Sequence, residues 1–218
     1  MPGPALIRVR ELQRVFGTLA ESNFEAMIAR LSVLYEDLRI ELFGIAEDSL
    51  GQLDQLGEKY RRVYFLRKSI GSLSEFADAV HQLENCPEFR LVSSHFTEEV
   101  ARYWIRASTF FRRNGAYLTS VRNDTGGHFG LRAARYAVSN VRADAVNGIE
   151  MSEPFTERSR VLLYFAGELV STAMLRQAVG VDTEHRIRRL IRIARVGYRH
   201  AARCVHCVVF SYLWERFA

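Results

Sequence analysis

One short segment of the chain carries the residue types that acid–base chemistry on a phosphate requires. It runs from residue 121 to residue 130 and reads VRNDTGGHFG. Arg122 supplies a planar cation whose N–H groups match the oxygens of a phosphate. His128, separated from Arg122 by five residues, has an ordinary pKa near neutrality and can therefore take up or release a proton. The pair predicts a site where the arginine holds a phosphodiester while the histidine moves a proton.

The segment lies at a break between two predicted helices. Apolar residues at helical spacing predict one helix that is capped by Thr97 and ends at a pair of adjacent glycines, which are poor helix residues. A second helix is predicted from about His128 to Val141. Arg122 then lies in the last turn of the first helix and His128 in the first turn of the second. We expect the loop to turn the two side chains toward each other.

This arrangement resembles the signature of the HEPN superfamily of helical-bundle proteins. In that signature an Arg, usually followed by Asn or another polar residue, precedes a His by a few positions at a helix break. The matching residues are Arg122, Asn123 and His128. The resemblance covers this motif and, loosely, the bundle around it. It implies a HEPN-like core and a metal-independent endoribonuclease that needs no cofactor, of the kind found among toxins and antiphage-defence effectors.

The resemblance also implies a role for each residue. Two subunits would pair symmetrically, so that two Arg–His sets meet at a homodimer interface. His128 would act as general base or acid, Arg122 would stabilise the charged phosphate, and Asn123 would orient the phosphate or the His. The products would be a 2′,3′-cyclic phosphate and a 5′-hydroxyl. The implied partners are RNA, further copies of the chain and, for a toxin, a neutralising protein.

The same residues also fit a purely structural role. Arg122 suits the negative C-terminal end of its own helix, and His128 fits simple packing at a helix start. Arg–His pairs at similar spacing recur elsewhere, because the chain holds 30 Lys and Arg residues and 6 His. They are Arg90 with His95, Arg195 with His200, and Arg199 with His206. Among these pairs, Asn directly follows the Arg at Arg122 alone. A HEPN-type bundle that binds RNA or a protein partner without cutting is the alternative function.

The elements that position this segment are predicted to be helices almost throughout. Four Pro and 14 Gly are few helix breakers for 218 residues. Apolar residues at steps of three and four predict helices over about 5–20, 24–45, 49–70, 97–125, 128–141, 155–179 and 183–217. Gly71 is predicted to end the third of these, Ser72 with Glu75 to cap a short extra helix, and Pro87 to mark a loop.

The expected fold class is therefore all-α, an antiparallel bundle of seven or eight helices. Residues 1–218 are expected to form a single helical domain. The resemblance adds a division within it, with the N-terminal helices, to about residue 95, as an extension packed on a C-terminal HEPN-like core.

Positive charge gathers on the last predicted helix. The chain has a net charge of +5, and five arginines recur there at steps of three and four, which places them along one helix face. They are Arg188, Arg192, Arg195, Arg199 and Arg203. This face is a candidate RNA-binding surface that contacts the phosphate backbone. A solvated face, or one paired with the acidic early helix, is the alternative.

The remaining features bear on location and metals. Three cysteines are too few for a disulfide scaffold, and the N-terminus shows no apolar leader, so a cytoplasmic protein is expected. The apolar stretch 161–179 is interrupted by Glu168 and Arg176 and predicts a core helix, with no membrane contact. His200, Cys204 and Cys207 share a helix face but lack further ligands, so we expect buried thiols and no metal site.

Overall fold

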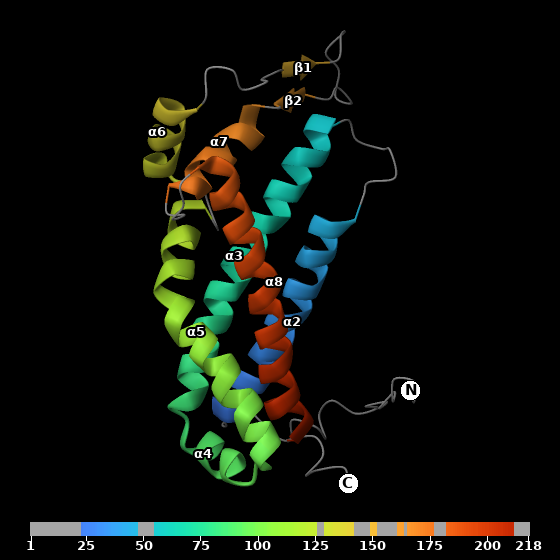
Figure 1. Ribbon diagram of the computed structural model, residues 1–218, viewed down its shortest axis with the longest axis vertical. Coiled ribbons are helices and arrows are strands. Elements are labelled where there is room, and N and C mark those ends of the chain that lie inside the picture. The colour runs from blue at the N-terminus through green and yellow to red at the C-terminus, as the bar shows by residue number, and fades with distance from the viewer. Residues whose placement is uncertain are drawn as a thin grey trace.

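Four long helices form an elongated bundle in which neighbours along its circumference run in opposite directions (Figure 1). A computed structural model describes residues 23–47, 55–125, 129–141, 149–151, 161–163, 165–176 and 182–211. The long helices are α2 (Asn23–Ala46), α3 (Gln55–Glu84), α5 (Glu98–Thr125) and α8 (Thr183–Val205). The shorter ones are α4 (Pro87–Ser94), α6 (Leu131–Asn140) and α7 (Phe165–Leu175). The predicted all-α bundle is confirmed in this part of the chain.

The core explains why these segments are helices. The predicted apolar stripe of α5 is buried, with Trp104, Ala107, Phe111, Leu118 and Val121 facing inward. Each of the long helices contributes to one continuous cluster of buried apolar side chains. The longest helix, α3, contacts α2, α5 and α8. The end of α5, where Arg122 lies, is therefore positioned by a shared core.

The sequence predicts a cap at Thr97 and another at Asp182 or Thr183, and the structure has the two caps at Thr97 and Asp182. The Thr97 Oγ1 atom accepts a hydrogen bond from the Val100 backbone N–H at 3.3 Å, at the start of α5. The Asp182 Oδ1 atom accepts from the His185 backbone N–H at 2.6 Å, at the start of α8. These bonds satisfy backbone donors that a helix start leaves without an internal partner.

The predicted helix end at Gly71 is wrong. Helix α3 runs without a break from Gln55 to Glu84. A glycine inside a helix costs about 1 kcal/mol, but Ile70 and Leu73 on either side are fully buried, and their burial outweighs that cost. Ser72 does not cap a new helix either, because its hydroxyl donates to Glu41 on α2 at 2.9 Å.

Other predicted boundaries also need correction. Pro87 opens the short helix α4 instead of marking a loop, because proline suits a first helical position. Helix α6 begins at Leu131, three residues after His128. Residues 161–163 form strand β2, paired antiparallel with strand β1 (Ile149–Met151), in place of the start of a helix. The predicted helix 5–20 lies outside the described residues, as do residues 212–218 at the end of the last helix.

Helix α8 continues into a π-helical turn, His206–Phe210. Cys207 lies within this turn and Cys204 just before it, and both are buried. Burial raises the pKa of the Cys204 thiol well above its usual range and that of Cys207 to about 11. Both side chains are therefore neutral, as expected of small buried apolar groups.

The carboxyl group of Glu41 is partly buried between α2 and α3. The Glu41 Oε1 atom accepts from Ser72, while its Oε2 atom is buried without a hydrogen-bond partner in the described structure. Burial raises the pKa of Glu41 from 4.5 to about 7. The folded protein thus holds a proton here that the unfolded chain releases at a lower pH.

We expect Glu41→Gln to stabilise the protein at pH 8. Because the folded-state pKa is raised, stability from this group is full below about pH 4.5 and is lost as the pH rises through 7. After allowance for solvent screening, the gain for Gln at pH 8 is about 2 kcal/mol. Urea unfolding between pH 5 and 8 measures it, with exposed Glu36→Gln as the control. Parallel pH profiles for Glu41→Gln and the wild type would contradict the prediction.

Candidate functional site

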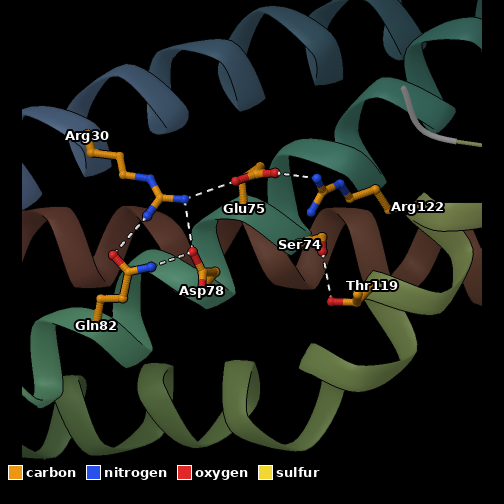
Figure 2. A network of polar contacts seen from close by, with 7 residues as sticks. All are labelled: Arg30, Ser74, Glu75, Asp78, Gln82, Thr119 and Arg122. Carbon is orange, nitrogen blue, oxygen red and sulfur yellow. Dashed lines mark hydrogen bonds and ion pairs between the residues drawn. The ribbon is translucent and has the colours of Figure 1, made fainter. Parts of the chain in front are cut away.

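Arg122 lies in the last turn of α5 and forms an ion pair with α3 (Figure 2). Its Nη2 atom is 2.9 Å from the Glu75 Oε1 atom. The Arg122 side chain nevertheless remains 42% exposed. Arg122 therefore pairs with an acid of a neighbouring helix instead of capping the carbonyl groups of its own.

Glu75 is shared between two arginines from different helices. Its second oxygen, Oε2, is 2.9 Å from Arg30 Nη2 on α2, and that nitrogen is also 3.0 Å from Asp78 Oδ2. Gln82 Oε1 accepts a further hydrogen bond from Arg30 Nη1 at 3.2 Å. Two cations and two carboxylates thus form a network across α2, α3 and α5, shown in Figure 2. The network fixes the position of the Arg122 guanidinium group relative to the bundle.

The end of α5 is anchored from two further sides. Asp124 and Thr125 are buried, and the Thr125 hydroxyl donates to the Val121 carbonyl at 2.9 Å. The Asp124 Oδ1 atom is 3.4 Å from Arg176 Nη1, at the end of α7. The Arg176 guanidinium also lies 5.5 Å from the ring centroid of Tyr136 on α6. These contacts join the last turn of α5 to the two helices that follow it.

The predicted break between helices is present. Helix α5 ends at Thr125, and Gly130 has an extended backbone before α6 begins. Asn123 is exposed beside Arg122. His128 lies outside the described residues, so its side chain is not placed relative to Arg122. The structure therefore fixes the position of the arginine and the asparagine in the predicted catalytic set.

The arginines of α8 form a largely exposed stripe, defined here as Arg188, Arg192, Arg195, Arg199 and Arg203. Arg188 pairs with Glu184 one turn earlier, and both side chains are about three-quarters exposed. Arg203 is half-buried, with its guanidinium 5.8 Å from the ring centroid of Tyr103 on α5. The central three arginines have no ion pair with any described residue. Pairing of these three with the acidic residues of α2 is thus not observed.

The arginine stripe and Arg122 lie on opposite sides of the bundle. Gly197 on α8 packs directly on Leu73 of α3, because a Cβ atom added at Gly197 would lie 2.7 Å from Leu73 Cδ2. Successive helix residues are rotated by about 100°. Glu75 therefore lies roughly 160° around α3 from its contact with α8, and Arg195 and Arg199 lie roughly 160° around α8 from its contact with α3. The two predicted functional surfaces point away from each other in one subunit.

A hollow of about 950 Å³ lies between α3, α6, α7, α8 and the end of α2. Four of its charged side chains are paired, because Lys59 forms an ion pair with Glu168 and Arg62 lies 3.8 Å from Glu58. The remaining wall is mainly apolar, formed by Ile45, Val63, Leu66, Leu175, Ile187 and Ile191. Arg122 does not line this hollow, so the predicted catalytic site lies outside it.

Two further features concern metals and membranes. Among the described residues, no group of three or more His, Cys, Asp and Glu side chains is arranged to hold a metal ion. The His200 ring stacks on Phe110, with ring centroids 4.7 Å apart. Within the same residues, no helix combines the length and apolar character needed to cross a membrane.

Glu75, the partner of Arg122, was missed as a site residue by sequence reasoning. Its spacing from Ser72 suggested a cap at a helix start, and the unbroken course of α3 removes that role. The pairing joins residues 47 positions apart in the sequence, which short motifs do not report. No protein-family model matches the chain, and neither a curated protein nor a solved structure matches it.

Proposed function

We propose that this protein is a metal-independent endoribonuclease with a HEPN-like core, which cleaves RNA at the end of α5. Arg122, Asn123 and His128 form the catalytic set, with the roles that the HEPN resemblance implies. The observation that carries the proposal is the geometry of Arg122. It is held in the last turn of α5 by Glu75 and still exposes 42% of its side chain.

The ion pair with Glu75 leaves room for a phosphate. A guanidinium group has five N–H donors, and the ion pair with Glu75 is formed through the Nη2 atom of Arg122. The remaining donors are suited to the oxygens of a phosphodiester. Glu75 also binds Arg30. Its single negative charge is therefore shared between two arginines and does not fully neutralise Arg122. A fixed, part-exposed cation stabilises charge that develops on a phosphate without having to reorganise.

The biological setting that goes with this proposal is a toxin or an antiphage-defence effector that acts as a homodimer. Pairing of two copies through the face that carries Arg122 brings two catalytic sets together. The arginine stripe then contacts RNA phosphates at a distance from the cleaved bond, since it lies on the other side of the bundle.

A non-catalytic RNA-binding module is the second candidate. It is favoured by the same ion pair, because the link to Glu75 gives Arg122 a structural task in joining α3 and α5. The unpaired central arginines of the stripe serve RNA binding equally well with or without cleavage.

Cleavage of a 5′-labelled single-stranded RNA by the purified protein, in the presence of EDTA, separates the two candidates. The proposal expects cleavage to continue in EDTA and to give products that end in a 2′,3′-cyclic phosphate. It also expects the His128→Ala variant to form no such products. His95→Ala is the matched control, since His95 is exposed and follows Arg90 at a similar spacing. RNA that is bound but left intact points to the second candidate. Equal cleavage by His128→Ala and the wild type rules out this catalytic set.

A further inference from the structure

A groove of about 520 Å³ lies between α5 and α8. Helix α5 contributes Phe110 and Asn114, and helix α8 contributes His185, Arg188 and Arg192. The groove is bordered by Arg188 and Arg192 of the arginine stripe, and Arg122 does not line it. Its volume falls in the range of small-ligand sites in proteins.

The cationic side of the groove is available to an anion. Arg188 and Arg192 are one helical turn apart and line the same wall. Arg192 is exposed and has no ion pair or hydrogen bond within the described structure. Arg188 pairs with Glu184, but such an exposed pair contributes little free energy. A phosphate therefore finds two guanidinium groups that are not committed to strong internal partners.

The α5 side of the groove is apolar and rigid. Phe110 stacks on His200 with an angle of 21° between the rings, and its edge contacts Phe111 at 5.2 Å between centroids. Burial, and then the charges of Arg203 and Arg199, lower the pKa of His200. The stacked pair is therefore uncharged at neutral pH and presents an apolar surface.

Asn114 adds a polar group beside this surface. Its side-chain Nδ2 atom donates to the Phe110 carbonyl at 2.8 Å, which fixes the amide group. Its side-chain oxygen remains to accept a hydrogen bond from a ligand N–H. An apolar ring, an adjacent acceptor and two arginines match the base and the phosphate of a nucleotide.

We propose that the groove between α5 and α8 binds a nucleotide, with the phosphate on Arg188 and Arg192 and the base against Phe110 and Asn114. The nucleotide is either a free mononucleotide or one unstacked unit of a single-stranded RNA. This site does not depend on cleavage at Arg122, so it goes beyond the proposed endoribonuclease.

Binding of AMP, of a single-stranded oligoribonucleotide and of the matching duplex to the full chain tests the proposal. Binding of AMP identifies a free-nucleotide site, and binding of the single strand with little binding of AMP identifies an RNA subsite. In either case Phe110→Ala and Arg192→Ala are expected to weaken binding at least about tenfold. Arg90→Ala, which removes the same charge from exposed α4, outside both the groove and the arginine stripe, is expected to weaken it less than about threefold.

Asn114→Ala and Phe110→Leu keep the test decisive if Phe110→Ala does not fold, because both alter the groove with less loss of core packing. We expect Asn114→Ala to weaken nucleotide binding and His128→Ala to leave it unchanged, even where cleavage is abolished. The proposal is overturned if neither AMP nor the single strand binds. It is also overturned if the duplex binds as tightly as the single strand, or if Arg90→Ala weakens binding as much as Arg192→Ala.

Discussion

Replacing Arg122 by alanine is expected to lower the rate of RNA cleavage by about two to three orders of magnitude, the typical effect of removing one preorganised donor to a charged transition state. The cost in stability is expected to be less than about 1 kcal/mol, because both members of the pair with Glu75 are more than a third exposed. Single-turnover cleavage rates and urea unfolding of the same samples measure the two effects.

Glu75→Ala is the matched control for this substitution. It breaks the same ion pair, together with the pair between Glu75 and Arg30, but it leaves the guanidinium group of Arg122 in place. Cleavage by Glu75→Ala is therefore expected to fall by less than about tenfold, through poorer positioning of Arg122. Equal losses of cleavage in the two variants, in proportion to their loss of stability, would show that Arg122 is structural.

The contact between Leu73 and Gly197 governs the second large effect, which is on stability. Leu73 is fully buried, and a large-to-small change at such a position costs about 2–5 kcal/mol. Gly197→Ala places a methyl group 2.7 Å and 2.8 Å from the two methyl carbons of Leu73. Overpacking of this kind costs about 1–3 kcal/mol.

In the double variant, Leu73→Ala with Gly197→Ala, the added methyl group enters the space that Leu73 leaves. We expect the double variant to be more stable than the sum of the single effects predicts, by about 1 kcal/mol or more. Urea unfolding of the four proteins measures the coupling. Gly115→Ala on α5 is the control, since a Cβ there has its nearest neighbour at 3.8 Å. Additive effects at residues 73 and 197 would contradict this description of the contact.

The sequence predicts most of the long helices because their apolar period is regular. The stripes of α2 and α5 and the caps at Thr97 and Asp182 are local signals, and the structure contains them. The sequence predicts two helices where α3 is one, because Gly71 is a local helix breaker. The burial of Ile70 and Leu73 against other helices keeps α3 continuous through Gly71. The hairpin of β1 and β2 was missed because each strand has three residues, too few for an alternating pattern.

The candidate site was predictable in its residue types and unpredictable in its surroundings. The motif around Arg122 indicates a phosphate-binding cation at a helix end, and that placement is present in the structure. The partnership with Glu75 and Arg30 depends on which helices are adjacent. The separation of Arg122 from the arginine stripe likewise follows from the packing of α3 on α8. Both the ion pairs of Glu75 and this separation depend on contacts between helices, which the residue pattern of a single helix does not predict.

Because Arg122 and the arginine stripe lie on opposite sides of the bundle, a dimer formed through the Arg122 side would present two cationic stripes to one RNA strand. In any two-fold assembly that buries the face around Glu75, both stripes point outward from the interface. Such a dimer presents two separate cationic tethers, and a long RNA held by the first reaches the second at a high effective concentration. Under the proposed function, the avidity for RNA is expected to rise with the length of the strand beyond a single stripe.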